Sequence, residues 1–389
     1  MQRRKFLQSS AAAIGVGTAS QLASVVVGAN EVSTPSTVHG TDGRLEHAGV
    51  EFFGVDELHR VEGLPGLRLQ RVPERLRTLL NQQAGQRMLG PDGCEIRFVS
   101  EGANVEVTLS SPRGGAELIA FWGGFQDIER HQIGAEPQTI RLTYPERVAQ
   151  LKPEVYRDHP FDPQVWRLTF MGANKHGTLH FHDIRGEGLR PPRADEVPKH
   201  TYLAYGTSVT DGFSATAMHL TYVAQTAWRL KANYINLGSA GSAYCEPELA
   251  DYIAARSDWD VATLCISANM IGAEFTVDQF RQRAEYLVNT IAGSNPTRPV
   301  VCITIWPYFG DLCVDIEGPH GKGLAVDYRR VLREIVQQSP HENLHLIEGA
   351  ELLQEINGYA MDITHPGDLG MIQIGERLAL RIKEIWSPK

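Results

Sequence analysis

The pattern of apolar and polar positions changes about halfway along the chain. Between residues 46 and 190, short segments such as GCEIRFVS and ANVEVTLSS alternate apolar with polar positions, and clusters of glycine, proline, asparagine or aspartate separate them. This alternation is typical of β-strands that bury one face. The pattern predicts a β-sandwich domain over 46–190, arranged like a jelly roll.

From residue 201 to residue 389 the pattern is different. TYLAYG, NYINLG, WDVATLCIS and RPVVCITIW are apolar throughout, and the segments between them, such as TVDQFRQRAEYLVNTIAG, have helical spacing. Strands that are apolar on both faces and alternate with helices form a parallel sheet covered by helices on each side. The sequence therefore predicts an α/β domain over 201–389.

Two further segments show neither pattern. Residues 30–45 are rich in serine, threonine and glycine, and residues 191–200 lie in the proline-rich and charged run EGLRPPRADEVPKH. Both compositions are typical of linkers. We expect the first segment to precede the β-rich domain and the second to join it to the α/β domain.

The first 29 residues have the layout of a signal peptide. Arg3 and Arg4 precede Phe6-Leu7 and a weakly apolar stretch, and small residues end at Ala29. This layout resembles a twin-arginine export signal, which implies transport by the twin-arginine translocase and a bacterial protein that is periplasmic or extracellular. Polar residues interrupt the stretch, so we expect no stable membrane anchor after cleavage. The alternative is a disordered tail with a chance arginine pair.

Charge and cysteine spacing exclude some classes of function. The formal net charge is −9, and no basic run lies beyond the N-terminus, so we expect no nucleic-acid partner. The five cysteines form no metal-binding spacing, and we expect no metal site. Cys245 and Cys313 could pair in an oxidising compartment, but the sequence does not establish this disulfide.

The first candidate for chemistry is Ser208, in the segment YGTSVTDG. It directly follows the predicted strand TYLAYG, and ligands of parallel sheets bind beyond the carboxyl ends of the strands. A serine nucleophile needs a histidine base. His365 lies in MDITHPG before the last predicted helix, and Asp362, three residues earlier, could orient its imidazole. The alternative for Ser208 is an ordinary turn serine.

An acyl-transfer enzyme also needs donors for an oxyanion. Gly238 ends the predicted strand NYINLG and could offer its backbone N–H, and Asn269 follows the strand WDVATLCIS and could offer its amide. Trp306 and Tyr308, in a long loop after RPVVCITIW, are candidates for the substrate pocket. The aromatic residues of FWGGF, residues 121–125, could stack on a sugar if exposed, or belong to the core.

Together these segments resemble the SGNH (GDSL-like) hydrolase superfamily. The motifs match as GTSVTDG with Ser208, NLGSAG with Gly238, SANM with Asn269, and DITH with Asp362 and His365. The resemblance covers residues 200–387. It implies a flavodoxin-like three-layer α/β/α fold and hydrolysis of carboxylic esters without a metal or cofactor. Its oxyanion hole would consist of the backbone N–H groups of Ser208 and Gly238 and the amide of Asn269.

The sequence departs from the family pattern at three positions. Thr207 stands where the family usually has aspartate, and Ser267 and Met270 replace the outer residues of Gly-x-Asn-Asp. We expect a serine esterase acting on short-chain acyl esters of small molecules or polysaccharides, with carbohydrate acetyl esters among the candidates. The alternatives are an acyltransferase with the same triad and a non-catalytic carbohydrate-binding protein.

Overall fold

The computed structural model describes residues 38–39, 44–173, 176–313 and 324–387, which belong to one compact unit. The predicted signal peptide, 1–29, and most of the predicted linker, 30–45, lie outside the described residues and stay predictions. So does the division into two domains. None of the helices in these described ranges is long and apolar enough to cross a membrane.

Two antiparallel sheets precede residue 187. The first has the strand order β1-β2-β3-β6-β12-β8-β10, with β9 paired to β8, and the second has the order β11-β7-β13-β5-β4. Their bounds are β1 (Val38–His39), β2 (Leu45–His47), β3 (Val50–Phe53), β4 (Glu57–His59), β5 (Leu67–Gln70), β6 (Glu95–Phe98), β7 (Asn104–Ser110), β8 (Ala116–Trp122), β9 (Phe125–Gln126), β10 (His131–Ile133), β11 (Gln138–Thr143), β12 (Trp166–Gly172) and β13 (His180–Gly186).

The two antiparallel sheets bury one shared apolar core. Phe98 and Leu168 of the first sheet belong to the same buried cluster as Val107 and Phe181 of the second. Alternate residues of the longer strands, such as β7, β8 and β12, supply this cluster, as the sequence pattern requires. The predicted β-rich segment is thus confirmed as antiparallel sheets, and the jelly-roll arrangement stays a prediction.

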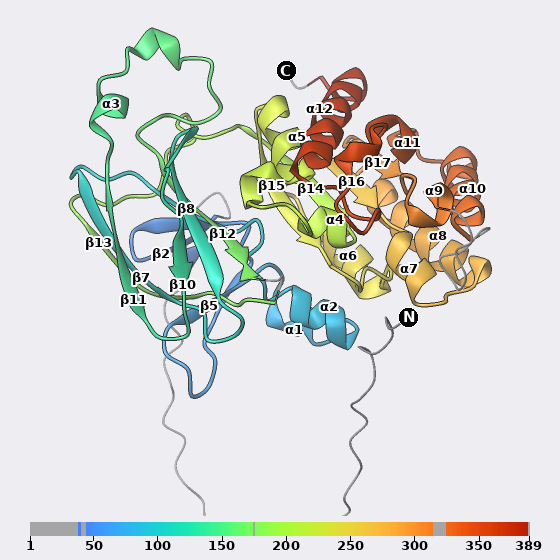
Figure 1. Ribbon diagram of the computed structural model, residues 1–389, viewed down its shortest axis with the longest axis horizontal. Helices are drawn as coiled ribbons and strands as arrows, with labels where there is room; N and C mark the ends of the chain where they lie inside the picture. The colour runs from blue at the N-terminus through green and yellow to red at the C-terminus, as the bar shows by residue number, and fades with distance from the viewer. Residues whose placement is uncertain (1–37, 40–43, 174–175, 314–323, 388–389) are drawn as a thin grey trace, which may run out of the picture. The chain divides into compact units, whose positions relative to one another are not determined.

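The second half of the chain forms a five-stranded parallel sheet with the order β15-β14-β16-β17-β18 (Figure 1). All four strand pairs are parallel. This is the order of doubly wound flavodoxin-like folds. The bounds are β14 (His200–Gly206), β15 (Ala232–Gly238), β16 (Val261–Cys265), β17 (Val300–Ile303) and β18 (Leu344–Ile347).

Helices cover both faces of the parallel sheet. Residues of α6, α8 and α10 share one buried cluster with Leu203 and Tyr205 of β14, whereas residues of α5 and α12 share another with Tyr202 and Ala204 (Figure 1). Neighbouring residues of β14 therefore face opposite layers, which is why the strand is apolar throughout. The predicted α/β fold is confirmed.

The helical segments of the described residues are short except where they cover the sheets. Their bounds are α1 (Glu74–Arg77), α2 (Gln82–Arg87), α3 (Glu146–Ala149), η1 (Pro153–Val155), α4 (Ser208–Asp211), η3 (Met218–Leu220), α5 (Tyr222–Leu230), α6 (Pro247–Ala255), α7 (Ala268–Gly272), α8 (Val277–Ser294), α9 (Phe309–Leu312), α10 (Leu324–Gln338), α11 (Gly349–Leu352), η4 (Ile356–Gly358) and α12 (Asp368–Ile385).

The start of α8 shows how the sequence sets a helix boundary. Thr276 is the N-cap residue: its hydroxyl accepts the N–H of Gln279, and the Gln279 side chain accepts the N–H of Thr276. This capping box satisfies two N–H groups that the helix itself leaves unbonded.

The short helices α1 and α2 connect the antiparallel region to the parallel sheet. Their buried residues Leu76 and Ala84 belong to the same cluster as α6 and α8. Asn81, the N-cap of α2, donates its amide to the Ser242 carbonyl at 3.0 Å and also binds Glu246. These contacts hold α2 beside the loop that follows β15.

The carboxyl end of β15 lies unusually close to α4. A Cβ atom at Gly238 would lie 2.1 Å from the backbone nitrogen of Asp211. Only glycine fits at this distance because any side chain would push α4 away from the sheet. Gly238 therefore determines how closely the helix that begins at Ser208 can approach β15.

We expect Gly238→Ala to destabilise the protein strongly. The added methyl group must displace backbone atoms of α4, and overpacking of this kind costs about 1–3 kcal/mol or more. The measurement is the free energy of unfolding from urea denaturation. Gly134→Ala is the matched control, because a Cβ there would meet nothing closer than the Gln138 side chain at 3.9 Å. Equal stability of the two variants would contradict this account of Gly238.

Candidate active site

The carboxyl ends of three neighbouring strands meet at one edge of the parallel sheet. Gly206, the last residue of β14, lies in register with Gly238 of β15 and Cys265 of β16. The segments after these strands contain Ser208, Gly241 and Asn269 and line one cavity. The topology therefore gathers residues that are up to 61 positions apart in the stretch 208–269.

Ser208 and His365 are in direct contact. Ser208 is the first residue of α4, is 9% exposed, and has its hydroxyl oxygen 2.8 Å from Nε2 of His365. The His365 ring also packs on the ring of Phe213, with centroids 4.5 Å apart. Phe213 lies one turn beyond Ser208, where its N–H donates to the Ser208 carbonyl. The imidazole is thus held on two sides.

Asp362 binds the other nitrogen of the imidazole. Its Oδ2 lies 2.6 Å from Nδ1 of His365, and its Oδ1 accepts the backbone N–H groups of Thr364 and His365, each at 3.0 Å. Burial acts to raise the pKa of Asp362, but the hydrogen bonds from these backbone and imidazole N–H groups outweigh it and lower the pKa. The side chain is therefore a carboxylate at neutral pH.

The ionised Asp362 determines the tautomer of His365. A carboxylate only accepts hydrogen bonds, so Nδ1 carries the hydrogen and Nε2 of the neutral ring keeps its lone pair. Nε2 can then accept the hydroxyl hydrogen of Ser208. This arrangement can make Ser208 a nucleophile.

Asn269 lies on the cavity wall with its amide oriented by the backbone. Its Oδ1 accepts the N–H of Ala243 at 3.1 Å, and its Nδ2 group remains to donate into the cavity. The residue is the second of α7, directly after β16.

The sequence predicted that Gly238 offers its N–H to the cavity, but Gly238 does not line the cavity. Its N–H donates to the Asn236 side chain at 2.8 Å, and its carbonyl accepts from Arg71 at 2.9 Å. The cavity is instead lined by Gly241, which has φ = +73° and lies in the loop after β15. The prediction of an oxyanion donor at Gly238 is therefore corrected: this N–H already has an acceptor within the protein.

The cavity around Ser208 has a volume of about 540 Å³ and largely apolar walls. Both predicted pocket residues, Trp306 and Tyr308, line it and are themselves mostly buried. Phe213, Tyr244 and Phe309 add aromatic surface. Such a cavity suits a small organic group next to the nucleophile.

Sequence reasoning missed one charged residue of the cavity. Arg87, at the end of α2, is the one lining residue with a permanent charge among the described residues. Its Nε donates to the Ala240 carbonyl at 3.0 Å, and its Nη1 contacts His176. No local motif marks Arg87, because it comes from the antiparallel half of the chain and reaches the site only through the docking of α2.

A family model matches the part of the chain that contains these residues. The GDSL-like Lipase/Acylhydrolase family matches residues 199–383, the region of the parallel sheet. This region belongs to the GDSL-like lipase/acylhydrolase family. The chain is therefore a serine ester hydrolase of the GDSL-like type, as the resemblance implied.

Solved structures share this fold over most of the chain. The salicylyl-acyltransferase SsfX3 from a tetracycline biosynthetic pathway has a TM-score of 0.68 at 15% identity, covering 88% of this chain and 97% of its own. A protein described as a GDSL-like lipase, from Bacteroides ovatus, has a TM-score of 0.63 at 17% identity, and the match covers 86% of this chain and 95% of that protein. A family two carbohydrate esterase from Cellvibrio japonicus has a TM-score of 0.59 at 13% identity, and the match covers 87% of this chain and 96% of that protein.

At these identities the likeness shows the fold alone. No match was found among curated protein sequences. The three structures share one fold but are described as an acyltransferase, a lipase and a carbohydrate esterase. The substrate of this GDSL-like hydrolase must therefore be argued from its own residues.

The structure shows the surroundings or the backbone conformation of each of the three residues that depart from the GDSL-like motifs. Thr207 is buried next to Ser208, and its carbonyl accepts the N–H of Asp211 in α4. Met270 is fully buried in the apolar cluster of α8, where a carboxylate would be costly. Ser267 has φ = +106°, a conformation that favours glycine. Ser267 thus adopts, at the position where the family usually has glycine, a conformation that suits glycine better than serine.

The remaining candidates for chemistry have ordinary roles. All five cysteines are unpaired, so Cys245 and Cys313 do not form the disulfide that the sequence left open. The described residues contain no group of three or more histidine, cysteine or acidic side chains that could hold a metal. His180 and His182 of β13 contact the Pro65 carbonyl and the Ser110 hydroxyl.

Proposed function

We propose that this GDSL-like hydrolase cleaves carboxylic esters with Ser208 as nucleophile, His365 as general base and then acid, and Asp362 as the residue that orients His365. The observation that supports this most is the continuous contact from Ser208 Oγ to His365 Nε2, 2.8 Å, and from His365 Nδ1 to Asp362, 2.6 Å. These are the distances that proton transfer to a base requires.

The proposed oxyanion hole has three donors. They are the backbone N–H groups of Ser208 and Gly241 and the Nδ2 group of Asn269, because these residues line the cavity around the Ser208 hydroxyl. The bond from Ala243 to the Asn269 oxygen fixes which end of this amide faces the substrate. Donors that are oriented before the reaction stabilise the developing charge without further reorganisation.

The reaction then proceeds in two steps. Ser208 Oγ bonds to the ester carbonyl carbon while its proton moves to Nε2 of His365, and collapse of the tetrahedral intermediate expels the alcohol with that proton. Water next attacks the acyl-enzyme, again losing a proton to His365. The carboxylic acid leaves, and Ser208 regains its proton.

We further propose short-chain acyl esters of carbohydrates as the substrate class. Aromatic walls such as Trp306, Phe213 and Tyr244 can cover the apolar faces of a sugar, and Arg87 can donate to its hydroxyl or carboxyl oxygens. Carbohydrate esterases share this fold, which is consistent with the proposal. Because the acyltransferase SsfX3 also shares this fold, the second candidate function is acyl transfer with Ser208 as the nucleophile.

The location of the protein is also a proposal. The twin-arginine layout of residues 1–29 supports export through the translocase to the periplasm or beyond, where polysaccharide esters are accessible. A non-catalytic carbohydrate-binding role remains the alternative if Ser208 does not react.

We expect Ser208→Ala to lower kcat for p-nitrophenyl acetate by about 10⁴-fold or more, since the acyl-enzyme cannot form. A fluorophosphonate probe should label the parent protein and not this variant. Ser257→Ala, on an exposed loop, is the control and should keep full activity and labelling. Near-normal turnover by Ser208→Ala would remove Ser208 from the mechanism, and absence of labelling in the parent would favour the binding protein.

We expect Asn269→Ala to lower kcat by about 10²-fold or more with little change in KM, because the amide acts on the transition state rather than the substrate. The control is Asn289→Ala on α8, whose side chain bonds Ser339 and not the cavity. Steady-state kinetics with p-nitrophenyl acetate make the comparison. An unchanged kcat would exclude Asn269 from the oxyanion hole.

The substrate class is tested by comparing acetylated xylo-oligosaccharides with p-nitrophenyl acetate. We expect Arg87→Gln to lower kcat/KM by about tenfold for the acetylated sugar, as loss of a charged hydrogen bond implies, and to change p-nitrophenyl acetate turnover little. Arg75→Gln, exposed on α1, is the control. Equal effects on both esters would contradict a sugar-binding role of Arg87.

Acyl transfer to added sugars in place of acid release would identify a transferase.

A further inference from the structure

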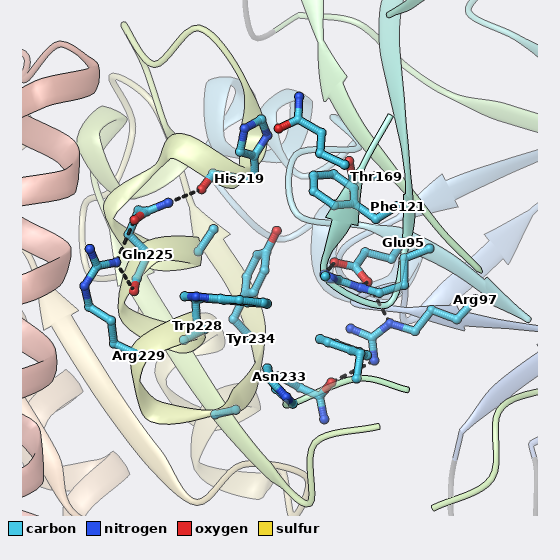
Figure 2. Close-up of a pocket in the computed structure, with 18 residues that line it drawn as sticks. Glu95, Arg97, Phe121, Thr169, His219, Gln225, Trp228, Arg229, Asn233 and Tyr234 are labelled. Atoms are coloured by element: carbon cyan, nitrogen blue, oxygen red, sulfur yellow. Dashed lines mark hydrogen bonds and ion pairs between the residues drawn. The ribbon is translucent and has the colours of Figure 1, made fainter. Parts of the chain in front are cut away.

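A second cavity, of about 300 Å³, lies between the first antiparallel sheet and α5 (Figure 2). None of its lining residues also lines the cavity around Ser208. It includes Asn233 and Tyr234 near the start of β15, five and four residues before Gly238 at the catalytic edge. At the rise of a β-strand, Asn233 lies about 16 Å from that edge. The cavity is therefore separate from the proposed active site.

Aromatic side chains form both walls of this second cavity. Figure 2 shows Trp228 and Tyr234 on one side and Phe121 on the other. Trp228 is 42% exposed and packs against the turn after β8, where a Cβ at Gly124 would lie 2.6 Å from its ring. Phe121 and Gly124 belong to the FWGGF segment, so this motif is neither an exposed platform nor only core: part of it lines a cavity.

Three side chains that line the second cavity have acceptor oxygens that are already occupied. Glu95 accepts from Arg97 at 2.7 Å and from Arg167 at 2.5 and 3.0 Å. The Asn233 oxygen accepts from Arg97 at 2.8 Å, and the Gln225 oxygen accepts from an arginine of α5 at 2.6 Å. A bound molecule therefore finds few acceptors in these side chains.

Donors, in contrast, remain. Each guanidinium has five N–H bonds, and the hydrogen bonds of Arg97 and Arg167 use only some of them. Burial and the nearby Glu95 raise the pKa of Tyr234, so its hydroxyl keeps its hydrogen. Nδ1 of His219 is buried without a hydrogen-bond partner among the described residues, and it can donate or accept according to the tautomer of the ring. The cavity thus favours a ligand with several acceptor oxygens.

The charges around the second cavity also favour a ligand with acceptor oxygens, in particular an anion. Arg97 and Arg167 are both at least nine-tenths buried and share the single carboxylate of Glu95. Glu51, opposite Arg97 in the sheet, has its own partner, Arg44, at 3.5 Å. A buried group with more positive than negative charge is stabilised by an anion.

We propose that this second cavity binds a small carboxylate carried on a ring, such as an aromatic acid or a sugar acid. The carboxylate would bind the N–H groups of Arg97 and Arg167 and the Tyr234 hydroxyl, and the ring would lie against Trp228 and Phe121. A carboxylate supplies the acceptors that the cavity lacks, and an arginine binds it with paired N–H groups. The site is independent of ester hydrolysis.

Isothermal titration calorimetry of the full-length protein tests the proposal with benzoate and D-glucuronate as probes. Benzamide and D-glucose are their uncharged counterparts. We expect one acid to bind with a Kd of about 1 mM or lower at low salt, at least tenfold more tightly than its counterpart, and more weakly as sodium chloride is added. Whichever acid binds identifies the source of the carboxylate.

Two variants locate the binding. Trp228→Ala and Tyr234→Phe should each weaken it about tenfold or more, and Trp228→Ala should still hydrolyse p-nitrophenyl acetate normally, which shows that it is folded. The controls are Tyr286→Phe, an exposed tyrosine on α8, and Arg87→Gln in the other cavity; both should leave the affinity unchanged. The proposal is overturned if neither acid binds below about 10 mM, if the uncharged probes bind equally well, or if both cavity variants bind like the parent.

Discussion

One buried arginine holds together the segments that surround Ser208. Arg71 donates to the carbonyls of Asn236 and Gly238 at the end of β15 and to the carbonyl of Arg87 at the end of α2, and it pairs with Asp211 of α4 at 3.3 Å. Arg71 and Asp211 are each almost fully buried. Removing one partner of such a pair leaves an uncompensated charge, which costs about 3–5 kcal/mol. The edge of the parallel sheet that carries Ser208 therefore depends on a residue from the antiparallel region.

This dependence explains how the two halves of the chain contribute to one site. The GDSL-like region supplies the proposed nucleophile, base and amide donor, because its parallel strands end at the same edge. The antiparallel half supplies α2, and with it the charge of Arg87 on the cavity wall. A structure described as an acyltransferase and one described as a carbohydrate esterase share this fold, so the fold alone does not specify the chemistry.

The two cavities also show two uses of charge. Around Ser208, the His365 imidazole and the Asn269 amide surround the place where the proposed reaction would develop negative charge. In the second cavity the guanidinium groups of Arg97 and Arg167 are permanently charged and share one carboxylate. The first arrangement suits catalysis and the second suits binding of an anion that is already charged.

The sequence by itself determined the α/β fold, the antiparallel strands before it, and six residues at the candidate site: Ser208, Asn269, Trp306, Tyr308, Asp362 and His365. Periodicity and strand ends are local features, so they can be read directly. Only the tertiary structure decided that Gly241 rather than Gly238 lines the cavity, since the acceptor of the Gly238 N–H is a side chain whose direction no pattern reveals. It also decided the place of Arg87 and the existence of the second cavity, because both arise where segments more than 100 residues apart pack together.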